Sequence, residues 1–335
     1  MNQNVRIKKI IEELDPQVFD EKKSLKVSNV VYLGMGWTHT NYLVTVNGRK
    51  VIFRISLLKG NRFAPGLKRA KEHIANEYNN AKNVQKLGIT PKAYYEDISC
   101  SKINKPFLII EYIEGKPVKR LGRKDVIALA LLLAKLHSID MIPKMRRSNF
   151  RKTFLTWNRQ RVNRIANDKE YSHFTNDSFK RALKNAYEEA SKIKFMKIKP
   201  SIIHNDPAGE NLLRTKDGIK LIDWEGVALG PPQYDITTVI DKEDLKAGKL
   251  RLFLSTYKRN VKRKDALLQL REYQIQRCLQ KLCIALSEAF KLKLEKQDAI
   301  KHLPLAYHIK NAQYEFRRCK ELGIFPIKSR LIIKL

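Results

Sequence analysis

Residues 202–235 read IIHNDPAGENLLRTKDGIKLIDWEGVALGPPQYD, a stretch in which polar residues recur at fixed intervals between apolar runs. His204 and Asp206 come first, Asn211 follows five residues after Asp206, and Asp223 follows twelve residues after Asn211. The apolar runs around them predict short strands, and the turn at 216–218 predicts a hairpin. Such a hairpin returns Asp223 to the side of Asn211, so these polar residues are expected to form one site.

Phosphoryl transfer from ATP requires these residue types. A carboxylate must accept or orient the proton of the attacking hydroxyl, and an amide oxygen and a second carboxylate must hold Mg²⁺ on the ATP phosphates. Protein kinases place the base aspartate and the metal-binding asparagine at the same spacing, with a metal-binding aspartate after a short hairpin. One such interval also arises by chance in a plain loop, but three polar groups flanked by apolar strands favour a phosphoryl-transfer site.

Three strand-like segments precede this stretch and occupy residues 27–33, 41–46 and 51–55. The first two are joined through Gly34-Met35-Gly36, and the last two through Asn47-Gly48, which is a strong hairpin-turn signal. The segment 106–113 (PFLIIEYI) indicates a further, buried strand. We therefore expect an antiparallel, β-rich lobe over residues 1–113, with one main helix predicted at 72–87.

The loop between the first two of these strands is suited to phosphate binding. It contains Gly34 and Gly36 and continues through Thr40 and Asn41 into the next strand. Glycine-rich loops of this kind donate main-chain N–H groups to the phosphates of ATP. His39 stands where a third glycine would complete the usual pattern, so a plain hairpin turn is equally compatible with this segment on its own.

Arg54 lies on the third predicted strand, where kinases carry the lysine that binds phosphate. Its neighbours along the strand are apolar and point to the opposite face, so Arg54 is expected to face a cleft. Glu77 in the following helix is the expected ion-pair partner, with Glu72 as the alternative. A single arginine on a strand is also common on protein surfaces, so this signal depends on the motifs around it.

The pattern changes to helices beyond residue 113. Residues 114–117 have the composition of a linker, and residues 125–137 form an apolar segment that is expected to be a buried helix. Helical patterns dominate from residue 245 onward. The chain is therefore expected to be α+β, with a nucleotide-binding lobe at 1–113 and a mainly helical catalytic and substrate-binding lobe at 114–335.

These motifs together resemble the choline kinase and aminoglycoside phosphotransferase superfamily, over most of residues 27–240 and most clearly at HNDPAGEN and LIDWE. The resemblance implies a bilobal, protein-kinase-like fold and transfer of the γ-phosphoryl group of ATP, with Mg²⁺, to a hydroxyl of a small molecule. The IDWE form, the arginine of VIFRI and the segment 38–42 lean towards the choline and ethanolamine kinases. The chain departs from the family pattern at Pro207-Ala208-Gly209 and after Glu225.

Matched position by position, the resemblance assigns roles to residues of this chain. It implies that Asp206 is the catalytic base, in a catalytic motif that includes His204, and that Asn211 and Asp223 bind Mg²⁺. Further residues are implied on the substrate side, near ATP and as support for the catalytic loop. They are Glu225 and Trp224 on the substrate side, Gly34, Gly36, Thr40, Asn41, Arg54 and Glu77 near the phosphates, Glu111 and Ile113 in the hinge whose main chain meets adenine, and Asp235 as a brace.

The chain of 335 residues carries a formal charge of +33, from 67 Lys and Arg against 34 Asp and Glu. Such an excess fits either polyanionic partners, of which ATP is one, or a basic compositional bias with solvated lysine faces, and it disfavours cationic acceptors such as aminoglycosides. Basic runs at 144–161 and 258–264 lie outside the motifs and fit either solvated helix faces or a surface for RNA or anionic lipid. The alternative function is therefore a non-catalytic, kinase-like scaffold that binds a polyanion.

Cysteine content and hydropathy restrict the cellular setting. Four cysteines without a CxxC pair argue against a zinc site or a disulfide framework and fit a reducing compartment. No run of about 18 uncharged apolar residues is present, so no transmembrane helix is expected. Residues 1–13 are charged and lack the apolar core of a secretory signal, so the expected location is the cytoplasm. The sequence carries no indication of an oligomeric state.

Overall fold

The computed structural model describes residues 2–36, 38–58, 66–139, 145, 150–296, 303–326 and 328–333. The chain divides into two compact units. The first consists of Met1–Arg146, Ile202–Ala228 and Val239–Lys262, and the second of Arg147–Ser201, Leu229–Thr238 and Arg263–Leu335. The lobe boundary expected at 113–114 falls inside the first unit and stays a prediction.

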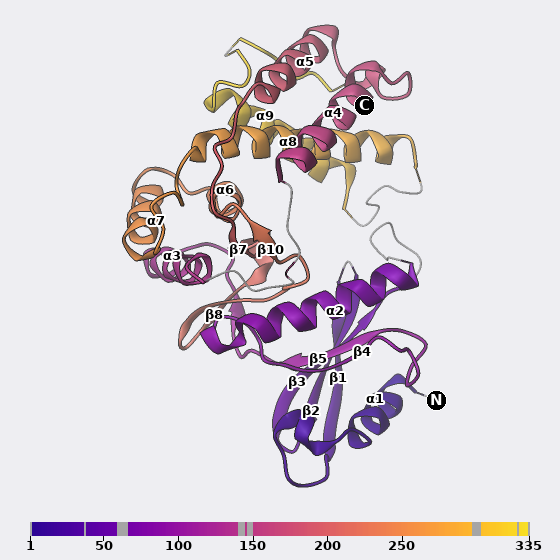
Figure 1. The fold of residues 1–335 in the computed structure, drawn as a ribbon. Helices are drawn as coiled ribbons and strands as arrows, with labels where there is room; N and C mark the ends of the chain where they lie inside the picture. The colour runs from indigo at the N-terminus through magenta and orange to yellow at the C-terminus, as the bar shows by residue number, and fades with distance from the viewer. Residues whose placement is uncertain are drawn as a thin grey trace. The chain divides into compact units, whose positions relative to one another are not determined.

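A five-stranded antiparallel sheet forms the N-terminal part of the first unit (Figure 1). Its strands, in the spatial order β1-β2-β3-β5-β4, are β1 (Val27–Met35), β2 (His39–Val46), β3 (Arg49–Ser56), β5 (Phe107–Glu111) and β4 (Ala93–Asp97). The β2–β3 turn has positive φ at Asn47 and Gly48 (47° and 78°), which is the geometry that an Asn-Gly hairpin turn requires. The expected β-rich region is therefore confirmed.

Helices cover both faces of this sheet (Figure 1). On one face, α1 (Gln3–Glu12) packs through Ile7 against a cluster that includes Phe53 and Phe107. On the other face, α2 (Leu67–Val84) packs through Ile74 against Leu108. Alternate residues of β5 thus enter different cores, which explains why this strand is an uninterrupted apolar run.

The stretch 202–235 forms the expected strands and hairpin. Ser201–Ile203 is β7, Leu212–Thr215 and Gly218–Leu221 pair as β8 and β9, and Ala228–Gly230 is β10, which pairs with β7. The 3₁₀ turn Gly209–Asn211 joins the catalytic loop to β8. Lys116–Pro117, expected to be part of a linker, instead forms β6 and pairs with β8, because the chain runs beside that hairpin after leaving the sheet.

Helices make up the remaining elements. In the first unit, α3 (Arg123–His137) and α7 (Ala247–Asn260) pack together, and the His137 ring lies 2.8 Å from the buried Tyr257 hydroxyl. In the second unit, α4 (Phe150–Asn167), α5 (Asp177–Ser191), α8 (Leu270–Lys293) and α9 (Leu305–Glu321) enclose an apolar core. Helix α6 (Gln233–Lys242) contributes residues to both units. None of the helices in the described ranges is long and apolar enough to span a bilayer.

Candidate active site

The catalytic loop begins at His204, whose ring is buried beside Trp224 with centroids 4.8 Å apart. The Asp206 main-chain N–H donates to His204 Nδ1 over 3.4 Å, so Nδ1 is an acceptor and the ring proton belongs on Nε2. Nε2 then donates to the main-chain oxygen of Ile222 over 3.1 Å. These contacts tie the loop to the end of β9, and the expected place of His204 in the catalytic group stays a prediction.

Asp206 lies next in the loop, with its side chain 45 % exposed. Its Oδ1 accepts from Lys242 Nζ at 2.5 Å, and its Oδ2 accepts from Asn211 Nδ2 at 3.3 Å. Asn211 Nδ2 also donates to the Asp206 main-chain oxygen over 3.0 Å. Because Asn211 is held through its nitrogen, its side-chain oxygen is the atom available to a metal ion.

Asp223 follows β9 and has a left-handed backbone conformation, with φ of 66°. The Ile222 N–H donates to the Asn211 main-chain oxygen over 3.0 Å, which brings the two expected metal ligands to neighbouring positions. Asp223, Asn211 and Glu225 line one polar cavity of about 560 Å³. The juxtaposition expected from the hairpin is therefore present in the structure.

Arg54 on β3 also lines this cavity and is tied to two partners. Its guanidinium forms an ion pair with Glu77 of α2, and its Nε donates to Asn41 Oδ1 over 3.0 Å. Both partners of the ion pair are largely buried, with 13 % and 3 % of the side chains exposed. The choice of Glu77 over Glu72 is thus confirmed, and Asn41 acts as an orienting partner of Arg54 across the β2–β3 register.

The glycine loop closes the polar cavity from the β1–β2 side. Gly34 has φ of 144°, and the Gly36 N–H donates to the His39 main-chain oxygen over 2.8 Å. Thr40 continues the loop into β2, paired with Ile55. His39 lines the cavity and is buried, and its Nε2 has no hydrogen-bond partner among the described residues. Burial lowers the pKa of His39 well below its usual value, so its ring is neutral.

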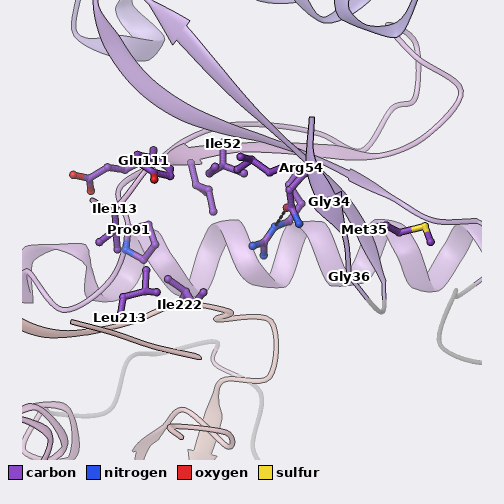
Figure 2. Close-up of a pocket in the computed structure, with 14 residues that line it drawn as sticks. Gly34, Met35, Gly36, Ile52, Arg54, Pro91, Glu111, Ile113, Leu213 and Ile222 are labelled. Atoms are coloured by element: carbon purple, nitrogen blue, oxygen red, sulfur yellow. Dashed lines mark hydrogen bonds between the residues drawn. The ribbon is translucent and has the colours of Figure 1, made fainter. Parts of the chain in front are cut away.

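A second cavity, of about 370 Å³, adjoins the first and shares Gly36, Asn41, Arg54 and Ile222 with it. It is lined mainly by apolar side chains, and Figure 2 shows Leu213 and Ile222 on the side opposite Ile52. Glu111 and Ile113 also line it. The Glu111 side chain accepts from the Lys92 N–H at 2.9 Å, and the N–H groups of Glu111 and Tyr112 donate to the main-chain oxygens of Lys92 and Lys50 over 2.8 and 3.3 Å.

Acidic side chains gather around Arg54 beside the polar cavity. Burial, together with the carboxylates of Asp223 and Glu77, raises the pKa of Glu225 to about 8. The His73 ring lies 3.5 Å from the Glu225 carboxylate. A cation near this carboxyl would favour its charged form, so the electrostatics of this cavity fit a divalent metal ion.

The donor chemistry also fits Mg²⁺ and ATP. Asp223 and Asn211 supply oxygen atoms, which Mg²⁺ prefers, and Mg²⁺ commonly completes its shell with phosphate oxygens and water. His39 Nε2 is itself buried and has no hydrogen-bond partner among the described residues.

Two expected site residues lie elsewhere. Trp224 is only 1 % exposed, and its Nε1 donates to the Leu221 main-chain oxygen over 2.9 Å. Its ring is therefore buried against His204, and the expected substrate-side role of Trp224 stays a prediction. Asp235 is fully buried in the first turn of α6, within the second unit, and its role as a brace of the catalytic loop stays a prediction.

The basic runs are only partly described. Residues 144 and 146–149 of the run 144–161 lie outside the described residues, as do the side chains of 150–153. In the run 258–264, Arg263 forms an ion pair with Asp265 and donates to Ser201 Oγ and the Lys199 main-chain oxygen. Arg263 is therefore engaged within its own unit, and contact of either run with a polyanion stays a prediction.

Sequence reasoning missed His39 as a lining residue of the polar cavity, and it missed the contacts of Lys242 and Glu243 with the catalytic loop. Lys242 contacts Asp206, and Glu243 Oε1 accepts from the Gly209 N–H at 2.6 Å. The available signal was the pair of charged residues directly after the apolar segment of α6, close to the motif in the sequence. That signal does not identify which loop the pair would reach.

The chain belongs to the phosphotransferase enzyme family, whose model matches residues 29–273. This membership confirms the superfamily expected from the motifs, and the structure confirms the kinase-like α+β fold. No curated protein matches the chain.

Solved structures share the fold at low sequence identity. A choline/ethanolamine kinase family protein from Mesorhizobium loti is 17% identical with a TM-score of 0.59, covering 96% of this chain and 94% of its own. The choline kinase LicA from Streptococcus pneumoniae is 17% identical with a TM-score of 0.59, covering 94% and 99%. Spectinomycin phosphotransferase, solved with ADP and spectinomycin, is 12% identical with a TM-score of 0.62, covering 97% and 99%.

Proposed function

We propose that this protein transfers the γ-phosphoryl group of ATP, in a Mg²⁺-dependent reaction, to a hydroxyl of a small molecule. The observation that carries the proposal is the pair of adjoining cavities that share Arg54 and Ile222. One is mainly apolar, as suits an adenine, and is lined in part by the hinge segment, and the other is polar and lined by Asn211 and Asp223. Structures of related fold contain AMP or ADP, which supports nucleotide binding here.

Each polar group has a place in this reaction. Arg54 and the N–H groups of the glycine loop would bind phosphate oxygens, and Asn211 and Asp223 would hold Mg²⁺, which neutralises charge on the transferring group. Asp206 accepts the proton of the acceptor hydroxyl as that oxygen attacks the γ-phosphorus. Positioning and electrostatic stabilisation supply most of the catalysis in reactions of this kind.

The proposed activity can be tested without knowing the acceptor. The protein is incubated with Mg-ATP and a pool of hydroxyl metabolites, and mass spectrometry detects any compound that gains one phosphoryl group. A defined panel of choline, ethanolamine, thiamine, sugars and aminoglycosides covers acceptors of differing charge. A phosphorylated product that requires both Mg²⁺ and the protein supports the proposal. Absence of product and of ATP consumption across pool and panel would contradict it and favour the scaffold function.

A further inference from the structure

Lys242, the last residue of α6, makes a direct contact with the proposed base. Its Nζ donates to Asp206 Oδ1 at 2.5 Å, and both residues belong to the first unit. The contact occupies Oδ1 of the carboxylate. The other oxygen, Oδ2, lies 3.3 Å from Nδ2 of Asn211, which is an expected metal ligand. A lysine ammonium at the C-terminal end of a helix is also favoured by the helix dipole.

The next residue anchors the same loop at a second point. Glu243 Oε1 accepts from the Gly209 N–H at 2.6 Å, and Gly209 has a left-handed φ of 63° that suits glycine. A carboxylate at a helix C-terminus is disfavoured by the dipole, and burial raises the pKa of Glu243. The hydrogen bond from the Gly209 N–H offsets these unfavourable effects on the Glu243 carboxylate. The end of α6 therefore holds the catalytic loop through two adjacent side chains.

Stability does not explain the Lys242 contact. The side chains of Lys242 and Asp206 are 37 % and 45 % exposed, and ion pairs at such exposure contribute little to folding. The exposed side of the pair is instead where an acceptor must approach Asp206. An ammonium at this place cancels the charge of the carboxylate, so an acceptor meets no net negative charge there.

Most of the large aromatic rings of the C-terminal region are unavailable to offset that charge. Recognition of a quaternary ammonium group needs exposed ring faces together with an acidic side chain. Four of these rings are instead buried in the apolar cores, namely Tyr257, Tyr273, Phe290 and Phe316.

We propose that Lys242 is a positioning residue that orients Asp206 through Oδ1, and that its charge selects acceptors without a cationic group beside the reacting hydroxyl. The proposal rests on the proposed phosphotransferase function. In the reaction, the hydroxyl proton moves to Oδ2 of Asp206 and the acceptor oxygen forms a bond to the γ-phosphorus. The bond from the γ-phosphorus to the β–γ bridging oxygen breaks, and ADP leaves with that oxygen.

The test compares the wild-type full chain with Lys242→Ala, Lys242→Arg and the matched control Lys246→Ala. Lys246 forms a similar exposed ion pair with Asp244, at 3.3 Å. The acceptors are glycerol, ribose, glycerate, choline and ethanolamine, and ATP hydrolysis by water is measured in parallel. Melting temperature and Mg-ATP affinity are measured for each variant, because neither should change if the fold and nucleotide site are intact.

Lys242→Ala is expected to lower kcat about 100-fold, whether the reaction measured is phosphoryl transfer to an acceptor or ATP hydrolysis by water. The reason is that misplacement of a reacting group, here the Asp206 carboxylate, by about 1 Å has an effect of that size. Lys242→Arg should restore kcat to within about tenfold, and Lys246→Ala should match the wild type. Glycerol, ribose or glycerate should be preferred over choline and ethanolamine.

Wild-type kcat in Lys242→Ala, or preference for choline or ethanolamine, would overturn this inference while leaving the phosphotransferase function in place. Absence of both transfer and hydrolysis in the wild type would contradict the proposed function itself, and this inference with it.

Discussion

The side-chain amide of Asn80 donates a 3.0 Å hydrogen bond to the main-chain oxygen of Trp224, directly after the expected metal ligand Asp223. Asn80 lies on α2, the helix that also carries Glu77, the partner of Arg54. One helix therefore contacts both Arg54 and the segment that follows Asp223. The same helix thus connects Arg54 to Glu77, 23 positions away in the sequence, and Trp224 to Asn80, 144 positions away.

Asn80→Ala should lower kcat by about tenfold or less with a small loss of stability, about 1 kcal/mol, the usual contribution of one hydrogen bond. The expected cause is looser placement of Asp223. Steady-state kinetics and denaturant unfolding measure the two effects. Asn79→Ala, at an exposed position of the same helix, serves as the control and should behave as wild type. Equal kinetics in both variants would show that the Trp224 contact does not position the site.

Asp223→Asn should weaken nucleotide binding only when Mg²⁺ is present. The substitution removes a negative charge from the oxygen ligands that suit Mg²⁺, while the apolar cavity for the base is untouched. Calorimetry measures the affinity for ATP with and without Mg²⁺. The increase in affinity that Mg²⁺ produces should be about tenfold smaller in the variant, which corresponds to about 1.4 kcal/mol of binding free energy. Asp217→Asn, in the exposed turn of the β8–β9 hairpin, is the matched control. An unchanged Mg²⁺ effect in Asp223→Asn would remove Asp223 from the metal site.

The Arg54–Glu77 ion pair predicts separable effects on stability and nucleotide affinity. Arg54→Met leaves the Glu77 carboxylate buried without its partner and should cost about 3–5 kcal/mol of unfolding free energy. The double variant Arg54→Met/Glu77→Met removes both charges and should recover most of that loss. Both variants should bind ATP more weakly, because the phosphate-side cation is absent. Normal ATP affinity in the stable double variant would exclude a phosphate contact by Arg54.

Asp125 and Arg214 join α3 to the β8 strand through two hydrogen bonds of 2.9 and 2.6 Å. The hydrogen bond from Arg214 lowers the pKa of Asp125. A carboxyl with a lowered pKa stabilises the folded state above its unfolded pKa and loses that contribution as pH falls through the folded value. Below about pH 4, the melting temperature of the wild type should therefore decrease more steeply with falling pH than that of Asp125→Asn. Parallel pH curves for the two proteins would contradict this contribution.

Local patterns predicted much of the fold. Alternation and the Asn47-Gly48 turn predict the β2–β3 hairpin, because a two-residue turn determines its own register. Helix α2 begins at Leu67, five residues before the predicted start, because its first turn is rich in basic residues that resemble an irregular segment. The buried positions Ala70, Ile74 and Glu77 nevertheless follow helical spacing through that turn. The β6–β8 pairing joins residues about a hundred positions apart, which no local pattern indicates.

The candidate site was predictable where a motif specifies spacing and unpredictable where burial decides the role. The intervals from Asp206 to Asn211 and Asp223 are sufficient to place these residues together once a hairpin is assumed. The same motif does not distinguish a catalytic His204 from a buried, supporting one, because that depends on the packing of Trp224. Lys242 reaches Asp206 across 36 positions, so only the three-dimensional structure reveals it.

The most direct test of the proposed chemistry is γ-phosphoryl transfer by Asp206→Asn compared with wild type, with the Mg-ATP affinity of both proteins measured alongside. The substitution keeps the size of the side chain and removes the group that accepts the hydroxyl proton. A positioned general base contributes about 10²–10⁴-fold, so kcat should fall by that factor while Mg-ATP affinity remains unchanged. Wild-type turnover by Asp206→Asn would contradict the assignment of Asp206 as the base.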